Sequence, residues 1–413
     1  MPGADLSSFD ATTVPEASMT THKPQNEAEA ACVIADAAAR RIPLSILGSG
    51  TKRALGRYTQ TQDVLSSAAL AGITLHEPAE LVIAARAGTP LAEVERKLGE
   101  ARQQLPFEPM DYRALLGTSG EPTIGGVAAT NLSGPRRIKA GACRDSFLGA
   151  RFVNGRGEAV KSGGRVMKNV TGLDLTRLMA GAFGTLGFLT EVTFKVVPSP
   201  ETQATLVLEG LSDRRAVAAL SAGLGSPFEV SGAAHLPAGI GAAGARTLLR
   251  LEGFESAVGY RTKALAEALR DFSAARVLDA QESEALWREV RDVTFLVSPR
   301  DTAIWRISVA PSKAPALIDT LGAELSARWF LDWGGGLIWL ACGAEGDAGA
   351  LPVHEAARLA EGHALLVRAP DAVRAAVDVF QPQPEPIMKL TRAVKQSLDP
   401  SAVLEPGRIY AGV

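Results

Sequence analysis

After a polar stretch at residues 1–23, hydrophobic positions recur at helical spacing, and short apolar runs follow. In residues 24–41, Ala, Val and Ile return every three to four positions behind Asn26, and acidic residues fill the first turn. This pattern predicts a helix with Asn26 as its N-cap. Residues 42–47 are a short apolar run that ends in a glycine-rich turn, which is typical of a strand followed by a tight loop.

The next two segments differ in their sequence pattern. Residues 77–105 predict a strand, a turn and a helix, with Thr89 as the helix cap and Pro90 at the first helical position. Residues 118–149 are rich in Gly, Ser, Thr and Asn and show no clear period. A loop of that length in a compact domain is usually functional, so we expect a functional loop there.

Further along, the pattern returns to regular structure. The NGRG sequence inside residues 150–162 predicts a hairpin, a helix is expected around 174–181, and residues 187–198 alternate like a half-buried strand. Residues 203–380 then repeat strand–helix–strand spacing, with helices expected near 213–224, 258–271 and 313–326. An antiparallel sheet covered by helices fits this spacing, so the fold class predicted for the chain is α+β.

Composition narrows the class of protein. The chain has 413 residues, of which 46% are hydrophobic and 21% charged, with a formal net charge of −2. These are ordinary values for a globular protein, and the absence of a basic excess argues against a nucleic-acid partner. The three cysteines share no CxxC spacing, which favours a reducing compartment over a disulfide framework. Neither a secretory signal nor a transmembrane run is expected.

Three glycine-rich segments carry the candidate chemistry, and each has a plain structural alternative. Residues 47–51 (LGSGT) can aim backbone N–H groups at a phosphate, or simply form a tight turn. Residues 123–131 (TIGGVAATN) let a flat ring press on the backbone, or form an ordinary loop. Residues 181–191 read alone as a turn and a core strand. Residues 47–51 are neither a Walker loop nor a GxGxxG dinucleotide fingerprint.

The order and spacing of these segments resemble the FAD-binding domain of the vanillyl-alcohol-oxidase superfamily, also called PCMH-type. The resemblance implies two small α+β subdomains around an extended FAD, with the pyrophosphate at the first segment and the flavin and ribityl side along the second. The last strand meets the adenine or flavin end. The implied cofactor-binding residues are Leu47, Gly48, Ser49, Gly50, Thr51, Thr118, Thr123, Gly125, Gly126, Asn131, Ser133, Gly184, Gly187 and Leu189.

Longer segments of the sequence point to a smaller family within this superfamily. Residues 123–137, 143–158 and 163–198, together with 298–309, 362–368 and the closing 395–410, resemble the E-subunit family of bacterial glycolate oxidases. That family implies an FAD-binding subunit beside a larger homologous flavin subunit and an iron–sulfur subunit. The complex oxidises glycolate to glyoxylate and passes electrons to a quinone.

The same resemblance sets the expected organisation of the chain and its place in the cell. It implies an FAD-binding PCMH-type domain at 1–198, an α+β cap that takes substrate or partner at 199–385, and a segment 386–413 that returns to the first domain. It also implies a cytoplasmic protein, peripheral at the inner membrane through its partners and without direct membrane insertion.

Several positions depart from the superfamily pattern. Thr51 stands where a histidine often holds the flavin covalently, and Cys143 is the only thiol of the second loop, so FAD is expected to be noncovalent. Glu405 replaces the usual Asn before Pro-Gly, where a carboxylate either alters a flavin-side hydrogen bond or caps a turn. Leu173 replaces a usual Tyr and is expected to pack. The expected cap offers no metal motif among its histidines, which are His235, His354 and His363.

Oxidation of a 2-hydroxy acid needs a cation for the carboxylate and a base for the hydroxyl proton. The candidate cations near the glycine-rich segments are Arg136, Arg137, Lys139 and Lys168, with surface charges or phosphate contacts as the alternative. No base is evident, so the catalytic residues stay unassigned. The apolar stretch around Trp329, Trp333 and Trp339 predicts either a partner interface or a core strand.

Three functions remain open on these grounds. The chain is an FAD-binding subunit of a glycolate-oxidising complex, a self-sufficient FAD-linked dehydrogenase for D-lactate or glycolate, or a structural subunit with an empty flavin site. A visible spectrum with and without anaerobic glycolate separates them. The poor histidine content of the expected cap and the missing base weigh against the second.

Overall fold

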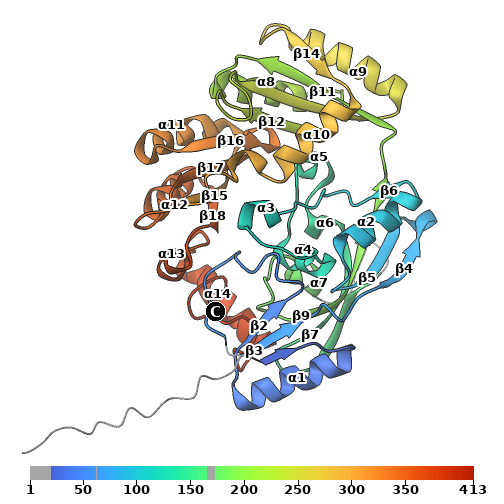
Figure 1. The fold of residues 1–413 in the computed structure, drawn as a ribbon, viewed down its shortest axis with the longest axis vertical. Helices are drawn as coiled ribbons and strands as arrows, with labels where there is room; N and C mark the ends of the chain where they lie inside the picture. Colours follow the sequence, from blue (N-terminus) through green and yellow to red (C-terminus); the bar gives the residue numbers. More distant parts are fainter. Residues whose placement is uncertain (1–19, 62, 165–172) are drawn as a thin grey trace, which may run out of the picture.

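The structure is a computed structural model that describes residues 20–61, 63–164 and 173–413. Its elements form two stacked halves (Figure 1). The lower half holds a three-stranded and a five-stranded sheet, and the upper half holds an eight-stranded sheet with its helices, which we call the cap. Helices and mainly antiparallel sheets confirm the predicted α+β class. The domain boundaries 1–198, 199–385 and 386–413 stay a prediction.

The first small sheet forms because a capped amphipathic helix packs on short buried strands. Asn26 caps the first helix by accepting a hydrogen bond from the N–H of Glu29 at 2.9 Å, as predicted. The buried side chains Ala30, Ile34 and Ala37 form its packed face. The sheet is parallel in the order β1-β3-β2. Its elements are β1 (Thr20–His22), α1 (Glu27–Arg40), β2 (Leu44–Leu47) and β3 (Asp63–Ser66).

The five-stranded sheet is antiparallel in the order β4-β5-β9-β7-β8. The NGRG hairpin is confirmed, since β7 and β8 pair on either side of it. The strand predicted at 187–198 is also present, as β9 and the short β10. The elements of this region are β4 (Ile73–Glu77), η1 (Pro78–Glu80), β5 (Val82–Arg86), α2 (Leu91–Glu100), β6 (Gln103–Gln104), β7 (Phe147–Val153), β8 (Ala159–Gly163), α7 (Leu175–Met179), β9 (Phe188–Lys195) and β10 (Val197–Pro198).

The N-cap residue predicted for the second helix, α2, is wrong by one position. Pro90 has extended backbone and is itself the N-cap, so α2 begins at Leu91. The hydroxyl of Thr89 instead bonds within the preceding turn, donating to the carbonyl of Arg86 at 2.7 Å. Thr89 is fully buried there. Because its hydroxyl is already hydrogen-bonded within this turn, it does not cap the N-terminus of α2.

The segment 118–149, predicted as a loop, contains three short helices, which is a second correction. Thr123 caps a helix whose first turn contains the paired glycines, because its hydroxyl accepts from the N–H of Gly126 at 3.2 Å. A Cβ at Gly125 would lie 2.6 Å from the Cβ of Ala87, so close packing selects glycine here despite its weak helix propensity. The helices of the region are α3 (Arg113–Leu116), α4 (Ile124–Thr130), α5 (Arg137–Ala140) and α6 (Cys143–Ser146).

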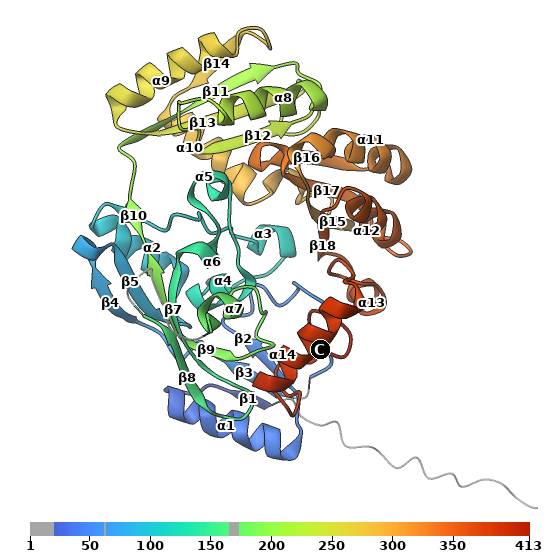
Figure 2. The same cartoon turned by 180° about the vertical axis from the view of Figure 1, so that it is seen from behind.

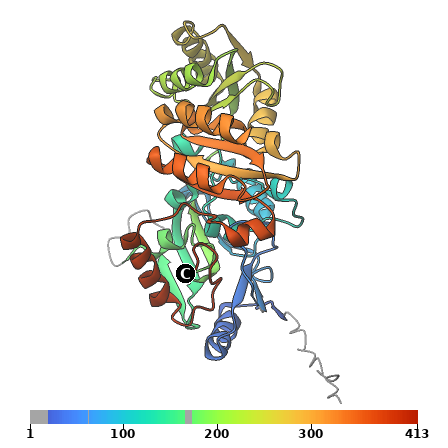
Figure 3. The same ribbon diagram turned by 90° about the vertical axis from the view of Figure 1, so that its left-hand side faces the viewer.

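The cap is an antiparallel sheet in the order β14-β11-β13-β12-β16-β17-β15-β18. Its strands are β11 (Thr202–Glu209), β12 (Gly232–Leu236), β13 (Arg246–Gly253), β14 (Ala275–Leu278), β15 (Thr302–Ser308), β16 (Arg328–Asp332), β17 (Leu337–Gly343) and β18 (His363–Arg368). The three predicted helices are confirmed as α8 (Asp213–Leu224), α9 (Glu255–Ala268) and α11 (Ala314–Leu325). The sequence pattern missed η2 (Thr294–Leu296), η3 (Pro311–Lys313), η4 (Trp333–Gly335), α10 (Ala280–Arg291), α12 (Ala350–Leu359) and α13 (Asp371–Ala376). Figure 3 shows the orange helices of the cap in front of its strands.

The C-terminal segment returns to the lower half through α14 (Glu385–Leu398) (Figure 2). The ammonium of Lys395 is buried and donates to the carbonyl of Thr185 at 2.8 Å, to the carbonyl of Leu404 at 2.7 Å and to Asp399 at 2.8 Å. Burial lowers the pKa of Lys395, and the charge of Asp399 opposes that shift. These bonds place the last residues against the strand that carries the first glycine-rich turn, where Leu44 bridges Leu404.

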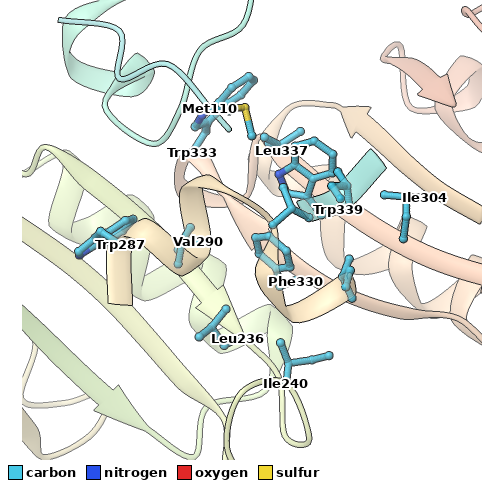
Figure 4. Close-up of a cluster of buried hydrophobic side chains, with 14 of the residues drawn as sticks. Met110, Leu236, Ile240, Trp287, Val290, Ile304, Phe330, Trp333, Leu337 and Trp339 are labelled. Atoms are coloured by element: carbon cyan, nitrogen blue, oxygen red, sulfur yellow. The ribbon is translucent and has the colours of Figure 1, made fainter. Parts of the chain in front are cut away.

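A shared hydrophobic core joins the cap to the lower half (Figure 4). Trp333 and Trp339 are 8% and 0% exposed, and Met110 from the lower half packs in the same cluster. Trp329 is partly buried against a neighbouring cluster. The core interpretation of these tryptophans is therefore the one that the structure supports. Leu173 contradicts its prediction, since it is 82% exposed and does not pack, because α7 begins only beyond it.

Ion pairs cross the same junction in both directions. Arg250 of β13 binds the carboxylate of Glu108 through two hydrogen bonds of 2.9 and 3.0 Å. Arg136 of the lower half binds Glu252 of β13, with its shortest hydrogen bond at 2.6 Å. All four side chains are largely buried, so each charge has a fixed partner of opposite sign.

Candidate flavin site

The three glycine-rich segments meet around one pocket in the lower half. The turn after β2 forms one side, the start of α4 another, and the turn before β9 a third. Of the predicted cofactor-binding residues, those that line this pocket are Leu47, Gly48, Ser49, Gly50, Thr51, Thr123, Gly125, Gly126, Gly184, Gly187 and Leu189. Segments far apart in sequence thus converge on one space, while their role as cofactor contacts stays a prediction.

Three of the predicted residues lie elsewhere. Thr118 stands behind the first turn, where its hydroxyl donates to the carbonyl of Thr51 at 2.9 Å. Asn131 and Ser133 line a smaller neighbouring cavity that shares Thr130 and Phe183 with the pocket. The motif spacing placed these residues near the site, but only the fold shows which cavity each one faces.

The first turn is held in shape by hydrogen bonds from its neighbours. The hydroxyl of Ser66 donates to the carbonyl of Gly48 at 3.1 Å, and the hydroxyl of Ser49 bonds to the carbonyl of Glu121. A Cβ at Gly48 would lie 2.3 Å from the hydroxyl of Thr123, so this turn must pack on the cap of α4 without a side chain. Gly50 has φ +82°, which only glycine adopts freely, and a Cβ there would meet no atom within 4 Å. A tight turn and a phosphate-binding turn are both compatible with this geometry.

The pocket contains cations that the sequence analysis missed. Lys52, Arg53 and Arg408 line it. Burial lowers the pKa of Lys52 to about 8, the charge of Asp111 opposes that shift, and Arg113 adds to it. Lys52 directly follows the LGSGT turn, which is the one signal that could have identified it from sequence. A cationic pocket wall next to a glycine-rich turn fits a pyrophosphate group.

Glu405 supplies a second test of whether the pocket fits a cofactor. Its side chain is 1% exposed and lines the pocket, where Oε1 accepts hydrogen bonds from the N–H of Ile46 at 2.7 Å and the hydroxyl of Ser45 at 3.2 Å. Oε2 is buried and has no hydrogen-bond partner among the described residues. Burial raises the pKa of Glu405, and the charge of Arg408 opposes that shift. A buried oxygen without a partner at the pocket wall fits a polar cofactor edge.

The cations that the sequence suggested for binding a substrate carboxylate have different surroundings in the structure. Arg136 is paired with Glu252 across the junction, and Lys139 lies 3.4 Å from Glu229 at the surface. Arg137 has no such partner among the described residues, and its guanidinium lies over the ring of Trp333. Lys168 lies outside the described residues.

Two of the three cap histidines, His235 and His354, are hydrogen-bonded within the protein. His235 bonds Thr247 at 2.9 Å and lies 3.2 Å from Asp213, and His354 bonds the carbonyl of Asp378 at 2.7 Å. Burial lowers the pKa of His363. Within the described ranges, no group of three or more His, Cys, Asp or Glu side chains could hold a metal ion. Cys143 is buried outside the pocket lining, and burial raises its pKa.

Comparison with known proteins agrees with this geometry. Residues 21–163 match the family model of an FAD binding domain. The chain is 38% identical over 375 residues to the glycolate oxidase subunit GlcE of Escherichia coli, covering 90% of this chain and 93% of that protein. The chain belongs to the GlcE family. The family assignment and the FAD-binding model together confirm the resemblance inferred from the sequence blocks and the expected cofactor, FAD.

The GlcE family also has more distant relatives in sequence and structure. The glycolate oxidase subunit GlcD of Bacillus subtilis is 31% identical over 205 residues, covering 48% of this chain and 42% of that protein. A 4-ethylphenol oxidase from Gulosibacter chungangensis has the same fold, with a TM-score of 0.69 at 12% identity over 95% of this chain and 89% of that one. p-Cresol methylhydroxylase gives 0.68 at 12% identity over 95% and 88%. These likenesses confirm the PCMH-type fold.

Among the residues that the structure describes, none of the helices is both long and apolar enough to cross a membrane.

Proposed function

We propose that this chain is the FAD-binding subunit of a glycolate oxidase complex that converts glycolate to glyoxylate. The observation that carries the proposal is the convergence of the three glycine-rich segments on one pocket with cationic walls. The identity to the E. coli subunit extends over nearly the whole chain, including the cap, which supports the same assignment.

Within the pocket, each part of the wall has a role that follows from its chemistry. The turn 47–51, with Lys52 and Arg53, would hold the pyrophosphate, because N–H groups and cations favour phosphate oxygens. The start of α4, from Thr123 to Gly126, would lie along the flavin and ribityl side, because its glycines leave the backbone open. Glu405 would meet a polar cofactor edge through Oε2. When bound, FAD supplies a two-electron acceptor, and the protein contributes position and exclusion of water.

The proposal includes partners and a location. A larger homologous flavin subunit and an iron–sulfur subunit would complete the complex and pass electrons to a quinone. The GlcD relative, itself named as a glycolate oxidase subunit, supports a complex of more than one flavin chain. We place the protein in the cytoplasm, at the inner membrane through these partners. Residues 1–198 would form the FAD domain, 199–385 the cap and 386–413 the returning segment.

A visible spectrum tests the proposal. We expect the purified chain to be yellow, to keep its flavin through gel filtration, and to reach full turnover with glycolate only after partner subunits are added. Rapid anaerobic bleaching and full turnover by the chain alone would instead support the self-sufficient dehydrogenase. A colourless protein whose thermal stability does not respond to added FAD would contradict the proposal and favour a structural subunit.

A further inference from the structure

Two arginines from different halves of the molecule lie over the same tryptophan ring. The guanidinium carbon of Arg137, at the start of α5, is 4.4 Å from the centre of the Trp333 ring, and that of Arg306, in β15, is 5.1 Å from it. Attraction between a cation and an aromatic face acts at these distances. The indole N–H of Trp333 donates to the carbonyl of Gly134 at 3.1 Å, which fixes the ring. One anchored ring therefore positions both cations.

Neither guanidinium has an acidic partner in the described part of the chain. No ion pair or side-chain hydrogen bond joins Arg137 or Arg306 to another described residue, and both residues are only partly exposed. The contrast with Arg136 and Arg250 is clear, since those two hold carboxylates at 2.6 and 2.9 Å. Two partly buried guanidinium groups at one ring, without an acidic partner among the described residues, therefore suit an anion that is not part of the protein.

The charges around the pair leave it positive. Burial lowers the pKa of Arg137 to about 10, and the charge of Arg306 acts in the same direction. Burial also lowers the pKa of Arg306. Asp332, the acidic group that acts on Arg306, is a weak counter-charge because burial raises its pKa to about 7. The other titratable groups that act on the two arginines are Tyr112, Arg144, Asp145 and His363.

Arg306 faces a small cavity that adjoins the flavin pocket. Thr130 and Phe183 line both spaces. Neutral polar side chains, among them Asn131 and Ser133, share the wall with apolar ones. Tyr112 also lines this cavity, and within the described ranges its hydroxyl donates only to the weak acceptor Met110 Sδ, at 3.2 Å. The space thus offers a cation, a hydroxyl and apolar contacts to a small anion.

We propose that Arg306 and Arg137 form a binding site for the carboxylate of a small 2-hydroxy acid beside the flavin pocket of this subunit. This site would bind the substrate of the proposed function. It rests on that function, because a bound acid can be oxidised only if a flavin occupies the adjoining pocket. A carboxylate presents two oxygens to guanidinium groups and would relieve the repulsion between the arginines.

Calorimetry on the purified full-length chain tests the site without requiring turnover. The probes are acetate, which has the carboxylate but cannot be oxidised as a hydroxy acid, together with glycolate and inorganic phosphate. We expect acetate and glycolate to bind, and Arg306→Met and Arg137→Met each to weaken binding at least tenfold. Arg306→Lys should recover part of the affinity. Arg144→Met is the matched control, since it removes a nearby arginine whose side chain is 52% exposed.

The outcomes are distinguishable from those of the proposed function. Flavin absorbance reports the proposed function, whereas carboxylate binding reports this site. Unchanged acetate affinity in both methionine variants, or phosphate binding more tightly than acetate at the same site, would overturn the proposal. The same holds if Arg144→Met weakens binding as much as Arg306→Met. Arg306 has no acidic partner among the described residues, so Arg306→Met loses only the contact with the Trp333 ring and should melt close to the parent. Arg137→Met provides an independent second variant.

Discussion

The carboxyl group of Glu405 accepts a hydrogen bond from the backbone N–H of Ile46 at 2.7 Å, across 359 positions of sequence. This contact ties the C-terminal segment to the strand that leads into the first glycine-rich turn. The other carboxyl oxygen is buried without a described partner and belongs to the pocket wall. One side chain therefore serves both the fold and the candidate cofactor site.

Substitution of Glu405 should separate these two roles. Glu405→Gln keeps an acceptor for Ile46 and resembles the protonated acid that burial favours, so FAD affinity should stay within about threefold of the parent. Glu405→Ala removes the acceptor and should lower the free energy of unfolding of the apoprotein by about 1–3 kcal/mol, with weaker FAD binding. Urea unfolding and FAD titration measure the two effects. Parent-like behaviour of Glu405→Ala in both assays would show that the contact is dispensable.

The pKa of Lys52 predicts a pH dependence of FAD binding. Lysine is charged below its pKa, which is about 8 in the apoprotein, and a bound pyrophosphate would raise that value. FAD affinity should therefore be constant below pH 7.5 or so and fall by up to about tenfold per pH unit above 8. Flavin fluorescence titrations between about pH 6.5 and 9.5 measure this.

Two variants of Lys52 provide the controls for that experiment. Lys52→Met should bind FAD more weakly at neutral pH and lose the decline, whereas Lys52→Arg should keep its charge and bind without the decline. If the parent and Lys52→Met show the same pH profile, Lys52 does not contact the phosphate groups.

Two glycines should respond oppositely to alanine. Gly125→Ala places a Cβ 2.6 Å from the backbone oxygen of Ala87, so the first turn of α4 must shift. We expect a loss of about 1–3 kcal/mol in the free energy of unfolding and reduced flavin content. Gly99→Ala in α2 meets no atom within 4 Å and should stabilise the protein by about 0.5–1 kcal/mol. Chemical denaturation of both variants checks the pair, and equal stability would refute the packing argument.

The ion pairs across the junction predict an acid-dependent stability. Burial alone would raise the pKa of Glu252, but Arg250 and the hydrogen bond from Arg136 outweigh it and lower the pKa to about 2. Because the folded pKa lies below the ordinary value of 4.5, the stabilisation is present above pH 4.5 and is lost as the pH falls toward 2. Its size is about 3 kcal/mol by linkage.

Glu252→Gln tests this assignment. The variant should be less stable than the parent at pH 7, and the difference should shrink as the pH falls through the same window. Urea unfolding at several pH values measures it, with the exposed Glu284→Gln as the control. A difference between parent and Glu252→Gln that does not change with pH would show that Glu252 is not held ionised by its arginines.

Local sequence patterns were sufficient to predict several of the helices and strands. The helical spacing behind Asn26, the NGRG hairpin and the three cap helices were predicted correctly, because capping, turn chemistry and periodicity act between near neighbours. The order of the glycine-rich segments likewise indicated a flavin domain through its resemblance to a known family. Thr89 was predicted wrongly because its hydroxyl bonds Arg86 and Gly72 and not the helix end. Leu173 was predicted wrongly because it lies exposed before α7. The helices within 118–149 were missed because close packing, such as that of Gly125 on Ala87, allows glycines in a helix.

The sequence by itself determined the fold class, the family and the segments that form the cofactor pocket. Only the tertiary structure showed that Arg136 is used in an ion pair while Arg137 and Arg306 both lie over the ring of Trp333, and that Glu405 reaches the strand before the first turn. It also assigned the tryptophans to the core and brought Lys52 into the pocket wall. The physical reason is that charge pairing and burial depend on distances between residues remote in sequence, which no local period records.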